Sequence, residues 1–140
     1  MKNLKKIVTL LLIFTMLLSF VACEKEKASL WDDALYTKDT LLGEGAKTLT
    51  VLVTCEEKTI TFTIKTDKAT VGEALMEHSL IAGEQGDYGL YIKSVNGIKA
   101  DYDTDKAYWG FFQNGEYMMT GVDTTNFESG QSYELVYTKG

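Results

Sequence analysis

The aromatic segment at residues 108–121 restricts most strongly what this chain can fold into, because it reads YWGFFQNGEYMMTG. Its Asn114-Gly115 dipeptide supplies the two positive-φ residues of a type I′ turn, so the segment predicts a β-hairpin. A two-residue turn also fixes the register of the strands that it joins. The predicted pairs are Phe112 with Tyr117, Phe111 with Met118, Gly110 with Met119, and Trp109 with Thr120.

Both faces of this hairpin are apolar, since successive side chains of a strand point to opposite sides. One face carries Tyr108, Phe112, Tyr117 and Met119, and the other carries Trp109, Phe111 and Met118. A small domain needs one apolar face for its core, so the second face needs another cover. That cover is either an apolar ligand, a protein partner, or the chain's own apolar segment at residues 30–42.

The first 22 residues have the pattern of a targeting signal. Three lysines precede an uncharged, mostly apolar run from Ile7 to Ala22, which is shorter than the ~20 residues that span a bilayer. Residues 20–23 read FVAC and resemble a bacterial lipobox, and charged residues follow directly after Cys23. We therefore expect cleavage before Cys23 and lipidation of this cysteine. The alternative is an ordinary secretory signal with a chance cysteine.

The expected organisation is a signal peptide at 1–22, a lipidated Cys23 with a tether and an edge-packing segment at 23–46, and one domain at 47–140. Without the signal, 11 lysines face 20 acidic residues, and the chain contains no arginine. Such an acidic surface disfavours nucleic acid, which requires cationic side chains. The expected partner is instead the membrane, held through the lipid on Cys23 at the outer face of the cell membrane, as in Gram-positive bacteria.

Periodicity predicts a mixed fold for the domain. Alternating apolar residues indicate strands at 48–54 and 59–65, joined by the acidic link at 56–58. Thr70-Val71-Gly72-Glu73 matches a capping box, and we expect a short amphipathic helix from there to Leu80, with Gly83 as its stop. A strand at 89–95 with a turn at Asn96-Gly97 follows, and 132–138 forms the last strand. With the aromatic hairpin, the order is ββαβββ: an α+β fold, a β-grasp with one helix packed on a mixed sheet.

Four blocks of sequence resemble a known family: TVGEAL at 70–75, GLYIKSVNG at 89–97, YWGFF at 108–112 with the turn that follows through Gly121-Val122, and GQSYEL at 130–135. On these blocks, region 47–140 resembles the bacterial domain of unknown function 4430 and the C-terminal β-domain of transcobalamin and intrinsic factor. The resemblance implies a ubiquitin-like or SLBB-like β-grasp that binds a soluble ligand. In the vitamin B12 carriers this domain closes over a corrinoid held by a separate helical barrel, which this sequence lacks.

By this resemblance the aromatic hairpin is the candidate ligand site. Flat rings and flexible methionines offer contact area at a low cost in entropy. The expected ligand-binding residues are Tyr91, Trp109, Phe111, Tyr117 and Met118. The implied ligand is a small molecule, with cobalamin as the candidate, and no cofactor is otherwise expected.

Three carboxylates at alternate positions, Asp101, Asp103 and Asp105, have the spacing that opens a calcium-binding loop. The match fails at the sixth position, which is Lys106 rather than glycine, and at the twelfth, which is Phe112 rather than glutamate. A solvated acidic turn is therefore the favoured interpretation. Weak binding of a divalent metal is the alternative.

The remaining reactive residue types favour structural roles. Cys55 closes the apolar strand beginning at Thr48 and is followed by two glutamates, so we expect a buried structural thiol. His78 is the only histidine, and a surface or boundary position is more usual than a metal-binding role. No nucleophile has a base at a recognisable spacing, so we expect no enzyme. The alternatives to a ligand-binding lipoprotein are an interaction or scaffold module of the cell envelope, and a weak metal-binding domain.

Overall fold

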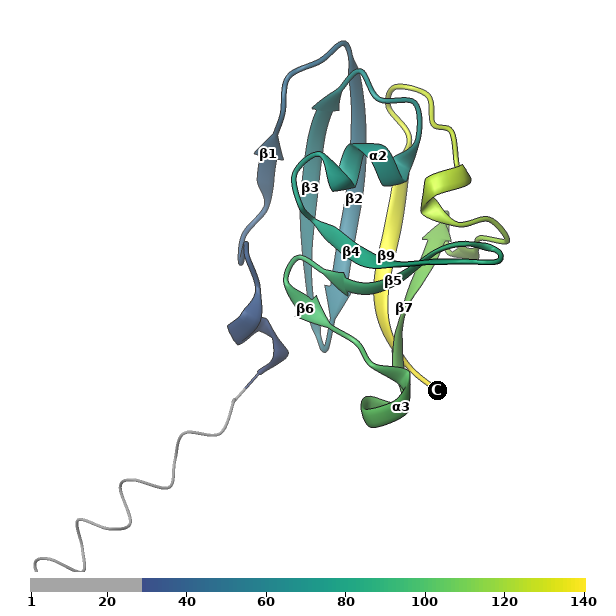
Figure 1. The fold of residues 1–140 in the computed structure, drawn as a ribbon. Helices are drawn as coiled ribbons and strands as arrows, with labels where there is room; N and C mark the ends of the chain where they lie inside the picture. The colour runs from purple at the N-terminus through teal and green to yellow at the C-terminus, as the bar shows by residue number, and fades with distance from the viewer. Residues whose placement is uncertain (1–28) are drawn as a thin grey trace, which may run out of the picture.

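The computed structural model describes residues 29–140, which form two β-sheets with short helices (Figure 1). The larger sheet is mixed, in the order β1-β3-β2-β9-β7-β8, and the smaller one has the order β4-β5-β6. The strands of the larger sheet are β1 (Thr40–Leu42), β2 (Lys47–Cys55), β3 (Lys58–Thr66), β7 (Ala107–Gln113), β8 (Glu116–Tyr117) and β9 (Ser132–Lys139). Those of the smaller sheet are β4 (Ile81–Gly86), β5 (Gly89–Val95) and β6 (Ile98–Lys99).

The helical elements are short. The α-helices are α2 (Val71–Met76) and α3 (Tyr102–Asp105), and the 3₁₀ turns are η2 (Leu30–Asp33) and η3 (Val122–Thr124). Figure 1 shows α2 and the smaller sheet in front of one face of the larger sheet. The mixed α+β class expected from the sequence is therefore confirmed.

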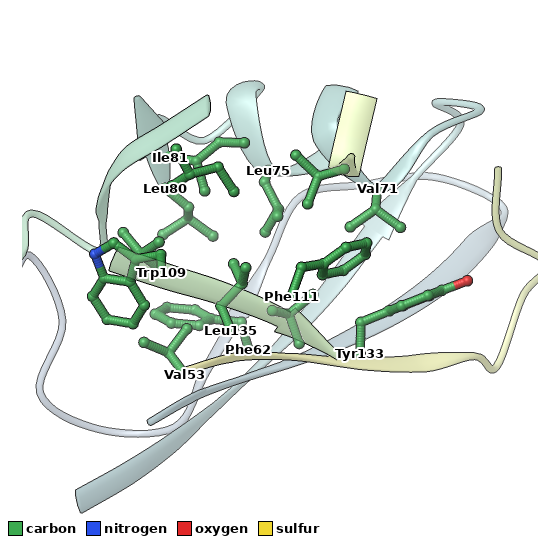
Figure 2. Packing of buried hydrophobic residues seen from close by; sticks show 14 of the residues in the cluster. Val53, Phe62, Val71, Leu75, Leu80, Ile81, Trp109, Phe111, Tyr133 and Leu135 are labelled. Atoms are coloured by element: carbon green, nitrogen blue, oxygen red, sulfur yellow. The ribbon is translucent and has the colours of Figure 1, made fainter. Parts of the chain in front are cut away.

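The strand pattern of β2 and β3 determines where the core lies. Their residues pair antiparallel, with Val51 opposite Phe62, and every second side chain is buried. Leu75 of α2, Trp109 of β7 and Leu135 of β9 pack against this buried face (Figure 2). The intervening positions of β2 and β3 are mostly threonines, which face outward and are well suited to strands.

The predicted start of α2 is confirmed, whereas its predicted end is wrong. The Thr70 hydroxyl accepts a hydrogen bond from the Glu73 N–H at 3.1 Å, as a capping box requires. The helix ends at Met76 rather than near Leu80, because Ser79 adopts a positive φ of 55° and turns the buried Leu80 back onto the core. Gly83 does not stop the helix: it lies at a bulge within β4.

The order ββαβββ predicts a single sheet, whereas the structure has two sheets. The predicted strand at Gly89–Val95 is present, but it pairs with β4 and β6 instead of joining the larger sheet. Strand β4 reads IAGEQG, and five of its six residues are exposed. Such a strand carries no apolar alternation by which a sequence pattern could reveal it.

The turn and the first pair of the aromatic hairpin are confirmed. Asn114 and Gly115 have φ values of 53° and 78°, and Phe112 lies opposite Tyr117. The Met118 N–H still donates to the Phe111 carbonyl at 2.9 Å, but the second strand ends there. The predicted pairs of Met119 and Thr120 do not form, because the chain turns away into η3.

The apolar segment at residues 30–42 does not cover the hairpin. Strand β1 pairs in parallel with β3 at the edge of the larger sheet opposite to β8. The indole N–H of Trp31 donates to the Cys55 carbonyl at 2.9 Å, so the front of this segment packs beneath β2. This segment therefore leaves the second face of the hairpin uncovered.

Asn96 joins this N-terminal segment to the domain. Its side chain is fully buried, accepts from the Tyr36 N–H at 2.9 Å and donates to the Tyr36 carbonyl at 2.8 Å. Its backbone bonds Leu35 and Leu80, and its φ of 52° is one that asparagine tolerates better than most residues. The turn predicted at Asn96-Gly97 is thus also a structural junction.

We predict that Asn96→Ala lowers the free energy of unfolding by about 2–4 kcal/mol, because it breaks two buried hydrogen bonds and leaves their partners unsatisfied. The exposed Asn114 has nearly the same φ, so Asn114→Ala is the matched control and costs only about 1 kcal/mol. Urea denaturation of both variants measures the difference. Equal losses would contradict a structural role for the buried amide.

Candidate ligand-binding site

The structure separates the two faces of the aromatic hairpin. Trp109 and Phe111 point into the core and are 6% and 7% exposed (Figure 2). The Trp109 indole N–H donates to the Ile98 carbonyl at 3.1 Å, and Phe111 stacks on Tyr133 with ring centroids 5.4 Å apart. The Trp109 bond therefore joins the two sheets, the Phe111 stack joins β7 to β9, and only a small part of either residue is accessible to a ligand.

The other end of the hairpin is open to solvent. Tyr117 is 58% exposed and packs edge-on against Phe112 at 5.5 Å, while Met119 is 93% exposed. Tyr88, in the turn between β4 and β5, is 98% exposed. Large apolar groups so exposed at neighbouring positions are typical of a contact surface.

A hollow of about 260 Å³ lies between β5, β7 and the segment at residues 117–122; we call it the aromatic hollow. It brings together all five predicted ligand-binding residues: Tyr91, Trp109, Phe111, Tyr117 and Met118. Leu90 and Val122 also line it, and Tyr88 and Met119 stand at its rim. Sequence reasoning missed these four. The β4–β5 pairing brings Tyr88 and Leu90 here, and the turn from β8 into η3 brings Met119 and Val122.

Asp123 fastens the two walls of the aromatic hollow to each other. Its carboxylate accepts from the Leu90 N–H at 3.0 Å and from the Gln85 amide at 3.3 Å. Gly89 and Gly121 lie so close that a Cβ on either would come within 2.8 Å of a carboxylate oxygen. The Leu90 N–H, followed by the Gln85 amide, lowers the pKa of Asp123 despite a partial loss of solvent.

The predicted acidic turn is a single helical turn rather than an open loop. Asp101 caps α3 by accepting from the Asp103 N–H at 2.9 Å, and Asp105 accepts from the Asp101 N–H at 3.4 Å. Two of the three predicted metal candidates are thus engaged by backbone amides. Within residues 29–140, no group of three or more His, Cys, Asp or Glu side chains is arranged to hold a metal ion.

Cys55 and His78 occupy the structural positions expected of them. Burial, with a further contribution from the Glu56 charge, raises the pKa of the Cys55 thiol to about 11, so the thiol stays protonated near neutral pH. His78 is half-buried beside Gly43, where a Cβ would come within 2.8 Å of its Nε2. The predicted lipidation site, Cys23, lies outside the described residues.

Two comparisons decide the family. The family model described as "Domain of unknown function (DUF4430)" matches residues 68–139. A crystal structure of "a putative metal binding protein" from Ruminococcus gnavus ATCC 29149 is 33% identical, with a TM-score of 0.64, and the match covers 68% of this chain and 99% of that one. The chain belongs to the DUF4430 family. The family expected from the sequence is therefore confirmed.

The DUF4430 fold also occurs in a larger protein. Haptocorrin, solved in complex with Cbi, matches with a TM-score of 0.55 and 18% identity. The match covers 66% of this chain and 25% of haptocorrin, so the DUF4430 chain spans about a quarter of that protein. No curated protein matches the chain. Among residues 29–140, no helix combines the length and the apolar character that crossing a membrane requires.

The hydrogen bonds of Asp123 predict an acid-dependent stability. Because its pKa is lowered in the fold, its carboxylate stabilises the folded state above the unfolded-state pKa of about 3.8, and this contribution is lost as the pH falls through the folded-state pKa. We expect Asp123→Asn to be less stable than the wild type near pH 7 and the difference to shrink in strong acid. Urea midpoints across that range measure it.

Asp87 is the matched control for this experiment, because it is exposed in the turn of the β4–β5 hairpin that Asp123 bonds. Asp87→Asn should not reproduce the pH-dependent difference. If the two variants behave alike, the effect comes from general charge removal and not from the bonds of Asp123.

Proposed function

We propose that this DUF4430 chain is a non-catalytic lipoprotein domain that binds a soluble ligand at the aromatic hollow. The observation that carries this proposal is the meeting of five residues named from the sequence, Tyr91, Trp109, Phe111, Tyr117 and Met118, around one hollow. Rings and methionine side chains there offer an apolar surface beside solvent. Such surfaces suit a ligand with a flat apolar face.

The size of the aromatic hollow determines how such a ligand would sit. At about 260 Å³ it is slightly smaller than the range of about 300–1,000 Å³ usual for enclosed small-molecule sites. A large planar ligand would therefore place one edge or face against it and extend past Tyr88 and Met119. We propose a corrinoid as the candidate ligand, since haptocorrin is in complex with Cbi and this chain matches a quarter of it. A partner would then complete the cleft.

The β-grasp topology is part of the same proposal. The β2–β3 hairpin, the helix α2 after it, and β9 parallel to β2 support this assignment. The smaller sheet is then an addition that supplies one wall of the aromatic hollow.

The absence of catalysis is likewise proposed. It is supported by Cys55, whose buried thiol is fully protonated at neutral pH, and by His78, whose buried Nε2 has no hydrogen-bond partner among the described residues. A nucleophile normally needs a base within hydrogen-bond reach. Among the described residues, neither Cys55 nor His78 lines the aromatic hollow.

A protein-interaction module of the cell envelope is the second candidate. The rim of the aromatic hollow favours it, since Tyr88 is 98% and Met119 is 93% exposed. Tyrosine and methionine are enriched in interface cores. The third candidate, a weak divalent-metal site, draws on the name of the Ruminococcus gnavus relative, but the amides bound to Asp101 and Asp105 count against it.

A spectral titration of the domain with cobalamin and cobinamide tests the ligand. We expect binding that weakens at least about tenfold in a Tyr117→Ala/Met119→Ala variant, because these two side chains are exposed and their removal spares the core. Tyr102→Ala, also at an exposed tyrosine but away from this hollow, is the control. An unchanged spectrum at high micromolar corrinoid, with the wild-type domain folded, would rule out the corrinoid; envelope proteins captured through Tyr117 and Met119 would support the second candidate.

If a lipid on Cys23 anchors the chain at the outer face of the membrane, Cys23→Ala should abolish incorporation of a labelled fatty acid into the chain. The variant chain should also leave the membrane fraction, since its one lipid attachment point is lost. Cys55→Ala removes the other cysteine of the sequence and is the control, which should stay labelled and membrane-bound. Labelling of the Cys23→Ala chain would refute the assignment.

A further inference from the structure

A second hollow, larger than the first, lies on the outer face of the smaller sheet; we call it the sheet hollow. Its volume is about 490 Å³, within the range of small-molecule sites. Strands β4, β5 and β6 form its floor, and α3 stands at one side. Only Tyr91 borders both this hollow and the aromatic hollow.

Small residues create the depression. Ala82 and Gly83 of β4, Ser94 of β5 and Ala100 after β6 line it, together with the longer side chains of Glu84, Lys93 and Lys99. Gly83 sits at the bulge of β4, where any Cβ would collide with the carbonyl oxygen of Tyr91. The close approach of β4 to β5 at this bulge therefore requires glycine.

Two tyrosine rings stand at different ends of the sheet hollow. Tyr91 is 46% and Tyr102 is 49% exposed, so both side chains are partly open to solvent beside the hollow. Tyr91 precedes Ser94 by three residues, about 10 Å along an extended strand, and Tyr102 belongs to α3 beyond that end. The ring of Tyr102 is held by Lys106, whose ammonium lies 5.5 Å from the ring centroid.

Charged side chains of both signs line the sheet hollow. Lys93 forms an ion pair with Glu84 at 3.2 Å, and Lys99, Asp101 and Asp103 complete the polar lining. Two cations against three anions nearly balance, which favours a neutral ligand over a strongly charged one. Carboxylates accept hydrogen bonds and ammonium groups donate them, so together they suit a ligand rich in hydroxyls.

We propose that the sheet hollow binds a neutral oligosaccharide. The apolar faces of two sugar rings would stack on Tyr91 and Tyr102, and the hydroxyls between them would bond the charged side chains on β4, β5, β6 and α3. Two rings beside an open hollow whose lining includes charged side chains match a linear chain of sugars better than a compact ligand. This site shares Tyr91 with the aromatic hollow, but its other lining residues are different.

Four soluble tetrasaccharides serve as probes: cellotetraose, chitotetraose, xylotetraose and mannotetraose. Each is added to the domain at up to about 10 mM, which reaches affinities weaker than millimolar. Binding is followed by the NMR signals of the tyrosine rings and the β4–β6 backbone. We expect at least one tetrasaccharide to shift Tyr91, Tyr102 and Lys99 in a saturable manner.

Variants distinguish this site from the aromatic hollow. Tyr102→Ala should weaken the binding at least about tenfold, and Ala82→Phe, which fills the exposed floor, should abolish it. Tyr117→Ala, which changes only the aromatic hollow, should leave the binding unchanged. The backbone spectrum of each variant reports whether it is folded, and two independent variants keep the test valid if one is not.

Two results would overturn the proposal. The first is the absence of saturable shifts with all four tetrasaccharides in the folded wild type. The second is a saturable shift that survives both Tyr102→Ala and Ala82→Phe or is lost with Tyr117→Ala. If corrinoid does not bind at the aromatic hollow, the tetrasaccharide results expected here stay the same. The two proposals can therefore be refuted independently of each other.

Discussion

The inward face of β7 lies between the two sheets, and the rest of the structure depends on its burial. Trp109 and Phe111 cover the face of the larger sheet beside α2, and the bond from the Trp109 indole to the Ile98 carbonyl attaches the smaller sheet. Because an unpaired buried N–H is costly, this bond fixes where β6 lies relative to β7. The position of β5 follows from β6, and with it the wall of the aromatic hollow.

Close backbone approach then completes the site. Gly72 of α2 packs so tightly on η3 that a Cβ would come within 2.9 Å of the Asp123 backbone, while Gly89 and Gly121 admit the Asp123 carboxylate. These glycines fall within or beside the sequence blocks that carry the family resemblance. Each of these glycines lets one element approach another more closely than a side chain would allow. The result is a rigid frame around an apolar hollow with an exposed rim.

Local patterns predicted the parts of this fold that are decided locally. The alternation in β2 and β3, the Thr70 cap and the Asn114-Gly115 turn all depend on residues within a few positions of one another. The helix end and β4 could not be predicted in this way. Leu80 lies outside the helix, where its side chain is buried in the core. Strand β4 is held by its pairing with β5, although five of its six residues are exposed.

The sequence by itself determined that both faces of the aromatic hairpin would be apolar, because successive side chains of a strand point to opposite sides. Only the tertiary structure decided which face became core. The packing of β9, α2 and the smaller sheet buried Trp109 and Phe111, and the outward-facing Tyr117 and Met119 remained at the rim. Which face is buried depends on contacts between segments far apart in the chain. The residue pattern of one segment cannot predict such contacts.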